Sequence, residues 1–487
     1  MATTRSNTFH VMVAQANPTV AWPTQGTVPY LPAVRNRNGA GPVAAGRGFG
    51  MATRHAYAQF DVSAHTGTPP QIVHVTNNNA SGAGSFHEAW AESVGPRIIV
   101  FDVGGRFPVT SNFYLESGDV WIAGQTAPSQ VLIDQTVTGK SLRIRDGNVF
   151  MQHCILWHSA LPEFPGQDNG NNDNALIVSS PSGVKSNIVL DHCFIGGGTD
   201  QVALFYIDVD NITLVDTLVG CPRGKDPEEA SGPNFHQYNM SLAGNSNDEN
   251  ADYVSLIGCV FEDGTERNPG TVVEHASYVN HLVYNRGTTG LMIRGKSDQD
   301  LAMSFSINVV GVWDRRGPNY VGSAQSAAVG LGRSDGTQDF YAGAKIFVDD
   351  CVATRMDETD VAVADEWDMV SDANDQETAV RSDTLVADGW PEGLVAAPMR
   401  SLSVADRLTL MTQNVGPRPN ERIQYIQDIV DDIVNGTGAQ QTDYPTPAVA
   451  SASSAYVEPS TPHAEGIEAG RSVVEEDLLD RGEALLR

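Results

Sequence analysis

Two arginines of this 487-residue sequence combine a residue type and a spacing that could bind an anionic group. Arg267 lies in ERNPG (266–270), and Arg294 follows 27 positions later in GLMIRG (290–295). Both stand at the ends of segments that resemble short strands. Because a guanidinium offers a planar fork of donors, it can bind a carboxylate through two parallel hydrogen bonds. The pair therefore predicts a carboxylate site, although most exposed arginines simply form surface salt bridges.

Three histidines, His153, His158 and His192, lie close enough in the sequence to suggest a metal site. Metal-binding spacings such as HExxH are absent, however, and His153 and His192 occupy equivalent positions in MQHC and LDHC. Equivalent positions are what a repeated unit produces when its copies stack. We therefore expect a structural column of histidines and not a set of metal ligands.

The elements that must position these side chains are short apolar segments that repeat along the chain. Each segment alternates as a strand does, and a turn follows it. The repeats start at Asn148, Asn187, Asn211, Tyr253, Tyr278 and Lys345. Intervals of 24 and 25 residues suit three short strands with their turns, and longer intervals hold inserted loops. One such coil cannot bury its apolar face alone, so the coils must stack. The sequence thus predicts an all-β fold, a right-handed parallel β-helix with short flanking helices and extended terminal arms.

Four of the five cysteines support this stacking. They lie six positions after their repeat starts, where Thr217 and the bulkier Tyr284 stand in two other coils. The four are Cys154, Cys193, Cys259 and Cys351. Stacked coils would bring them into one inward-facing column. A disulfide framework or a metal site is the alternative, but an odd number of cysteines and the lack of CxxC favour the column.

Composition and patterning divide the chain into five parts. They are an N-terminal arm (1–39), the parallel β-helix (40–355), a loop and helix that pack on its flank (356–440), a linker (441–462) and a C-terminal amphipathic helix (463–487). The segment 423–438 is predicted to be a helix that ends at Gly436. Its apolar stripe is Ile426, Val430 and Val434.

The charge of the chain bears on its partners. A total of 30 basic residues against 59 acidic residues gives a formal net charge of −29. Such a surface repels phosphate backbones, so we expect no nucleic-acid partner. A run of about 18 apolar residues is absent, so we also expect no membrane span. The N-terminus lacks the apolar run of a secretory signal. The location stays unknown, with an extracellular or a virion-associated protein as the two hypotheses.

Eight short phrases, taken in order and spacing, carry a resemblance to a known family. They are GRGFG (46–50), VHVTNNNASGAGSFHEA (73–89), VFDVGGRF (100–107), IAGQTAP (122–128), NIVLDHCFIGGGTD (187–200), ERNPG (266–270), GLMIRG (290–295) and NVGPRPNERIQYIQDIV (414–430). Together they resemble the pectate lyase family of parallel β-helix polysaccharide lyases, in particular its bacterial branch. The resemblance covers roughly residues 42–438.

This resemblance implies β-elimination in a polymer that contains uronic acids. In the family, a base removes the proton α to a uronate carboxylate, and calcium and cationic side chains stabilise the resulting enediolate. The base is the arginine of an Arg-x-Pro pattern, which Arg267, Asn268 and Pro269 match. Arg294 matches a second arginine, which holds the substrate.

The sequence also departs from the family pattern, which implies a degenerate active site. The family's substrate-binding lysine falls on Asn239, and Lys225 is a cation that could replace it from a loop. Among the calcium ligands, Asp200 matches one, Asp173 lies beside another, and Leu204 replaces a third. Calcium takes six to eight oxygen ligands, so the calcium site that the resemblance implies would be weak. Both aspartates could instead be turn residues.

Two functions remain open from the sequence. The first is an enzyme that cleaves a uronate polysaccharide, with Arg267 as base, Arg294 as carboxylate ligand, and Asp200 with Asp173 as cation ligands. The second is a non-catalytic structural or adhesion protein that reuses the fold, such as a viral tail spike or a surface appendage. In both hypotheses the partner is an acidic polysaccharide, and the terminal arms could join copies into a homo-oligomer.

Overall fold

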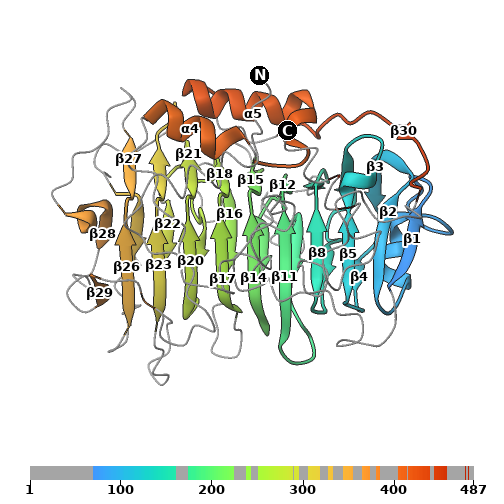
Figure 1. Ribbon diagram of the computed structural model, residues 1–487, viewed down its shortest axis with the longest axis horizontal. Coiled ribbons are helices and arrows are strands. Elements are labelled where there is room, and N and C mark those ends of the chain that lie inside the picture. Colours follow the sequence, from blue (N-terminus) through green and yellow to red (C-terminus); the bar gives the residue numbers. More distant parts are fainter. Residues whose placement is uncertain are drawn as a thin grey trace, which may run out of the picture.

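The computed structural model is a solenoid of three stacked sheets, which confirms the predicted parallel β-helix (Figure 1). The structure describes residues 70–160, 174–223, 237–242, 251–288, 290–294, 305–318, 327–332, 344–354, 365–372, 380–383, 386, 404–413, 415–438, 444–457, 478 and 481. Within these residues the sheets have eleven, ten and nine strands. We call them the first, second and third walls, in the order in which each coil meets them.

The strands of each wall follow the chain at intervals of one coil. The first wall contains β1 (Gln71–Val75), β2 (Arg97–Phe101), β5 (Val120–Ala123), β8 (Val149–Gln152), β11 (Lys185–Asp191), β14 (Val209–Val215), β17 (Ala251–Ile257), β20 (His275–Val279), β23 (Ser306–Val310), β26 (Lys345–Asp349) and β29 (Arg381–Ser382). The second wall contains β3 (Val103–Val109), β6 (Val131–Gln135), β9 (Cys154–His158), β12 (Phe194–Gly196), β15 (Leu218–Gly220), β18 (Val260–Glu262), β21 (Leu282–Tyr284), β24 (Trp313–Arg315) and β27 (Val352–Thr354), with β30 (Ala452–Ser453) at its edge. The third wall contains β4 (Phe113–Leu115), β7 (Leu142–Ile144), β10 (Leu176–Val178), β13 (Gln201–Phe205), β16 (Tyr238–Leu242), β19 (Gly270–Thr271), β22 (Leu291–Ile293), β25 (Val329–Leu331) and β28 (Val370–Asp372).

Parallel pairing places equivalent residues of successive coils opposite one another. On the first wall, Leu190 faces Leu214, which faces Leu256, and all three side chains are buried. Because side chains alternate along a strand, every second residue points into the interior, where columns from the three walls form one core. Burial of a leucine side chain stabilises the fold by about 1.5–3 kcal/mol. Each coil is therefore stable only against its neighbours.

The cysteine column is confirmed, with one change of register. At the turn between the first and second walls, the column runs Cys154, Cys193, Thr217, Cys259, His281, Val312 and Cys351. All five cysteines are free and buried. The prediction that Tyr284 belongs to this column was wrong. The pairing of Val254 with Ala276 shows that the repeat starts at His275 and not at Tyr278, which places His281 in the column.

The histidine column is confirmed for His153 and His192, whose buried rings have centroids 5.2 Å apart. His153 Nδ1 accepts a hydrogen bond from the backbone N–H of Arg418 (3.1 Å), and His192 Nδ1 pairs with Asp191 Oδ1 (2.5 Å). Burial lowers the pKa of His153 well below its usual value. Burial also opposes protonation of His192, but the charge and hydrogen bond of Asp191, together with the charge of Asp216, outweigh it and raise the pKa. Both rings therefore have a structural role at the turn between the first and second walls.

Helices α4 (Val404–Gln413) and α5 (Gln424–Asn435) lie over the second wall (Figure 1). The predicted helix at 423–438 is confirmed by α5, which ends at Gly436 with φ +67°. Ile426 and Val430 are buried as predicted, whereas Val434 is 39% exposed and Ile433 takes its place in the stripe. The stripe packs on apolar residues of the wall's outer face.

Four short helices complete the named elements of the described residues. They are η2 (Glu88–Glu92), η3 (Gly124–Thr126), η5 (Glu366–Met369) and η6 (Pro419–Glu421), the last of which precedes α5.

The C-terminal part of the chain returns to the first coils of the solenoid (Figure 1). Strand β30 pairs antiparallel with β3. Beyond it, Tyr456 and Leu478 pack with Trp121 and Phe150 on the outer face of the first wall. Gln125 Nε2 donates a hydrogen bond to the carbonyl oxygen of Leu478 (3.3 Å). Residues far apart in sequence therefore cover one apolar patch.

Two predicted parts lie almost wholly outside the described residues. The N-terminal arm (1–39) is outside them, as is the C-terminal helix (463–487) apart from Leu478 and Arg481. The five-part division and the role of the arms in assembly therefore stay predictions. Among the residues that the structure describes, no helix is both long and apolar enough to cross a membrane.

Candidate functional site

Both predicted arginines lie on the third wall, beside a row of outward-facing residues. Strands β13, β16, β19 and β22 place Leu204, Ser241, Gly270 and Met292 opposite one another. Residues before and after them, such as Met240 and Leu242, belong to the core. Alternation along the strands therefore turns this set, which we call the outer row, away from the core. Arg267 precedes β19, and Arg294 directly follows β22.

Two contacts and one glycine fix the Arg267 side chain on the outer row. Its Cζ lies 4.2 Å from the centre of the Tyr238 ring, and its Nη1 donates a hydrogen bond to Ser241 Oγ (3.0 Å). Gly270 leaves room, because a Cβ at that position would lie 2.9 Å from Arg267 Cγ. Among the described residues, Arg267 forms no ion pair, and its buried Nε has no hydrogen-bond partner. The guanidinium is thus fixed without being neutralised by an acid of this part of the chain.

A tight loop before β19 presents Arg267, which has φ +58°, and the peptide bond Asn268–Pro269 is cis. The carbonyl oxygen of Arg267 accepts a hydrogen bond from the N–H of Met240 (2.9 Å). The loop is therefore attached to the preceding coil at the arginine itself.

Asn239 supports this loop from inside the wall. Its side chain is fully buried, and its Nδ2 donates to Asn268 Oδ1 (2.6 Å) and to the carbonyl oxygen of Glu262 (3.0 Å). Asn268 Nδ2 in turn donates to the carbonyl oxygen of Gly264 (3.1 Å). The residue at the place of the family's lysine thus bonds to the loop that carries Arg267.

Tyr238 is the residue around which the predicted site residues gather. It starts β16, is paired in register with Gln201, and forms a bridge with Glu266. Its pKa is raised, first by burial and then by the charges of Glu266 and Asp200, whereas Arg267 and Arg294 lower it. Asp200, Arg267 and Arg294 are therefore all close enough to act on one phenol group.

Sequence reasoning missed Tyr238. A signal was present, because this aromatic residue directly precedes the asparagine in the lysine position.

Arg294 is half-buried at the end of β22. Its backbone N–H donates to the carbonyl oxygen of Thr271 (2.9 Å), and its Nε lies 2.7 Å from Met292 Sδ.

Arg145 occupies the position on the third wall that corresponds to Arg294, because it directly follows β7 as Arg294 follows β22. Arg145 has its Cζ 3.6 Å from the centre of the Tyr114 ring and pairs with Glu116 Oε1 (2.8 Å). Arg145 is therefore a natural internal control for the site arginines.

The described residues near Asp200 do not provide a calcium site. Asp200 is half-buried and precedes β13, and the pairing of β13 with β16 places Gln237 beside it. Leu204, further along β13, has no ligand oxygen. Asn174 is buried, and its Oδ1 accepts a hydrogen bond from the N–H of Gln201 (3.1 Å). Calcium takes six to eight oxygen ligands, and the group of described residues that could hold a metal ion does not include Asp200. Asp173 and Lys225 lie outside the described residues.

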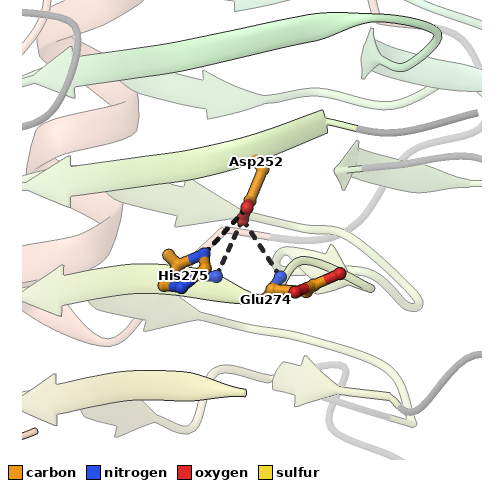
Figure 2. Close-up of side chains that lie close together, drawn as sticks. All are labelled: Asp252, Glu274 and His275. Carbon is orange, nitrogen blue, oxygen red and sulfur yellow. Dashed lines mark hydrogen bonds and ion pairs between the residues drawn. The ribbon is translucent and has the colours of Figure 1, made fainter. Parts of the chain in front are cut away.

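A group that could hold a metal ion lies elsewhere on the same coils, at the start of β17 and β20 (Figure 2). Ligand atoms of Asp252, Glu274 and His275 all lie within 4.8 Å of one another. Asp252 Oδ1 accepts hydrogen bonds from the backbone N–H groups of Glu274 (3.1 Å) and His275 (2.8 Å). Asp252 Oδ2 pairs with His275 Nδ1 (2.8 Å), and the His275 ring stacks on Tyr253 with centroids 4.4 Å apart. Hydrogen bonds to Asp252 thus explain much of the arrangement.

A further acid, Asp210, acts on this group. Burial, followed by the charges of Asp252 and Asp208, raises the pKa of Asp210 to about 6. Burial would lower the pKa of His275, but its hydrogen bond with Asp252 and the charge of that acid raise it. The group is thus a potential cation site in which the acids raise the pKa of the histidine. Sequence reasoning missed it, because no motif joins Asp252 to a histidine 23 positions later.

No protein-family model matches the chain. Among curated proteins, the probable pectate lyases C of Neosartorya fischeri and Aspergillus terreus are each 27% identical over 260 residues, which is 53% of this chain and 53% of theirs. The corresponding protein of Emericella nidulans is 29% identical over 238 residues, 49% of each chain. The chain thus spans about half the length of the curated relatives it matches.

Solved structures include two bacterial pectate lyases that are similar to this chain. A variant of the Bacillus subtilis enzyme is 12% identical, with a TM-score of 0.42 over 78% of this chain and 98% of that chain. The enzyme of Paenibacillus sp. 0602 is 10% identical, with a TM-score of 0.42 over 82% and 98%.

The stacked walls define a parallel β-helix protein. The curated proteins that are similar to about half of this chain are named probable pectate lyases. They lend no support to the structural alternative, such as a tail spike.

Proposed function

We propose that the chain cleaves a uronate polysaccharide by β-elimination along the outer row of the third wall. The observation that carries this proposal is the state of Arg267, which Tyr238 and Ser241 hold in place without an ion pair among the described residues. A second arginine, Arg294, stands one coil further along, near the same tyrosine. One guanidinium can bind the sugar carboxylate while the other faces the neighbouring carbon.

The reaction divides between the two arginines. Arg294 binds the uronate carboxylate through its donor fork. Arg267 removes the proton from the carbon α to that carboxylate. The electron pair of the broken C–H bond forms a double bond to the adjacent ring carbon, whose bond to the glycosidic oxygen breaks. The departing oxygen takes a proton from water, and Arg267 returns its proton to solvent.

An arginine base needs surroundings that favour its neutral form, because its usual pKa lies above 12. A nearby positive charge lowers the pKa of a base, and a neighbouring acid raises it. Among the described residues, Arg267 has no ion-pair partner, and Arg294 is a second cation near Tyr238.

The other predicted site residues take different parts in this proposal, or none. We propose that Asn239 acts by holding Asn268 and the Arg267 loop, since it is buried. Substrate binding by Lys225 and cation binding by Asp173 stay predictions. Asp200 belongs to no group of described residues that could hold a metal ion, so this part of the wall does not fit calcium, which takes six to eight oxygen ligands. No step of the reaction is therefore assigned to calcium.

The test is the absorbance of the unsaturated uronate product, followed with polygalacturonate and with alginate. Wild-type protein should produce the signal, and Arg267→Lys should lower kcat by at least about 100-fold, the usual contribution of a general base. Arg294→Lys should raise KM about tenfold, because an ammonium lacks the bidentate fork. Arg145→Lys, the matched control in the same row position, should leave both constants unchanged.

Two results would overturn the proposal. One is the absence of product with every uronate polymer tested while the protein binds the polymer, which would favour the non-catalytic alternative. The other is cleavage by Arg267→Lys at the wild-type rate.

A further inference from the structure

We propose that Tyr238 is a positioning residue for Arg267, and that its ring face fixes the guanidinium in the plane in which it meets the substrate. This inference rests on the proposed function of Arg267 for its consequence in catalysis. Its structural part, the control of one side chain by another, can be tested separately.

Geometry places the ring and the guanidinium in direct contact. The Cζ of Arg267 lies 4.2 Å from the centre of the Tyr238 ring, within the range of a cation–π contact. Tyr238 itself is held by its strand, with Gln201 on one side and a bridge to Glu266 on the other. The ring is therefore a rigid surface on which a long, flexible side chain can rest.

A second contact limits rotation of the guanidinium on that surface. Ser241 Oγ accepts a hydrogen bond from Nη1 of Arg267 (3.0 Å). Ser241 lies three residues after Tyr238 on the same strand, β16. One strand thus fixes both the plane of the guanidinium and its direction in that plane.

The Arg145–Tyr114 pair of the same wall has a similar geometry but differs from the Arg267–Tyr238 pair in having an acid. There the guanidinium also rests on a tyrosine, with Cζ 3.6 Å from the ring centre, but Glu116 binds its Nη1 (2.8 Å). A carboxylate in that position occupies donors of the guanidinium. At Arg267 a ring and a hydroxyl group provide the contacts, and no described acid forms an ion pair with it. Tyr238 therefore fixes the geometry of Arg267 without an ion pair in the described part of the chain.

The experiment compares Tyr238→Leu with Tyr238→Phe, and uses Tyr114→Leu as the matched control. Removing the ring should lower kcat about tenfold with little change in KM, the loss expected for a partly desolvated cation–π contact. The phenylalanine variant keeps the ring and should retain kcat within about threefold. Tyr114→Leu should retain both constants, because Arg145 has no part in the reaction.

A second readout does not depend on activity. In protein with selectively ¹⁵N-labelled arginine, the Nε–H resonance of Arg267, assigned by its loss in Arg267→Lys, should be shifted by the ring current of Tyr238. The shift should disappear in Tyr238→Leu and persist in Tyr238→Phe. An unmoved resonance in the leucine variant would overturn the inference, as would equal loss of kcat in both variants. If wild-type protein cleaves no uronate polymer, the proposed function fails, and the resonance alone still decides whether Tyr238 positions Arg267.

Discussion

Replacing Gly270 with alanine would place a methyl group against the side chain of the proposed base. The new Cβ would lie 2.9 Å from Arg267 Cγ, 3.2 Å from its Cβ and 3.5 Å from its Cδ. Carbon atoms in contact normally lie about 3.5–4.0 Å apart. The Arg267 side chain must therefore move by about 0.6–1.1 Å, and its contacts with Tyr238 and Ser241 must change with it.

The expected effect follows from that displacement. A misplacement of about 1 Å at a reacting group costs roughly 100-fold in rate. We therefore expect Gly270→Ala to lower kcat/KM by about tenfold to 100-fold, which corresponds to about 1.4–2.7 kcal/mol. The midpoint of thermal unfolding should change little, because the displaced side chain lies on the outer face of the wall.

Gly330 provides the control, since it lies on β25 opposite Met292, in the same row. Among the described residues, a Cβ there would meet only the carbonyl oxygen of Leu291 at 3.7 Å, an ordinary contact. Gly330→Ala should therefore keep kcat/KM within about twofold. Initial rates on polygalacturonate decide the matter. Equal rates for Gly270→Ala and Gly330→Ala would refute the idea that the position of Arg267 limits the reaction.

Two further predictions concern groups buried away from the outer row. Burial, together with the adjacent Asp263, raises the pKa of Glu262 well above its usual value. The stability linked to this proton is present below the unfolded pKa of about 4.3 and is lost as pH rises through the folded pKa. The melting temperature of Glu262→Gln, relative to wild type, should therefore increase between about pH 4 and pH 8, and a constant difference would contradict this. Burial also makes the five cysteines unreactive, so a thiol reagent should modify none in the native protein and all five after denaturation. Rapid modification of any cysteine in the folded protein would show that this thiol is accessible to solvent.

The sequence predicted the solenoid well because its signal is repeated in every coil. Alternating segments, and cysteines at one position of the repeat, each report the same stacking. The one register error, at Tyr278, came from a segment in which two starts three residues apart both place apolar residues at alternate positions. Only the pairing of Val254 with Ala276 separates them.

The site was less predictable because it depends on contacts between coils. Arg267 and Arg294 could be found from their types and from the family pattern. Tyr238 could not be assigned a role, since its contact with Arg267 joins residues 29 positions apart across two walls of intervening chain. The buried state of Asn239 likewise depends on its partner Asn268. The cover that Leu478 forms on Trp121 lies beyond any local pattern, because the two residues are far apart in the sequence.

The most direct test of the account is the chemical form of the products made from a uronate oligomer in isotopically labelled water. β-Elimination creates a double bond and adds no water, so each new non-reducing end should be unsaturated and the fragments should contain no labelled oxygen. Mass spectrometry should find such products with wild-type protein, and Arg267→Lys should form them at least about 100-fold more slowly. Labelled oxygen in the fragments would indicate hydrolysis, and unsaturated products formed equally fast by Arg267→Lys would remove this arginine from the reaction.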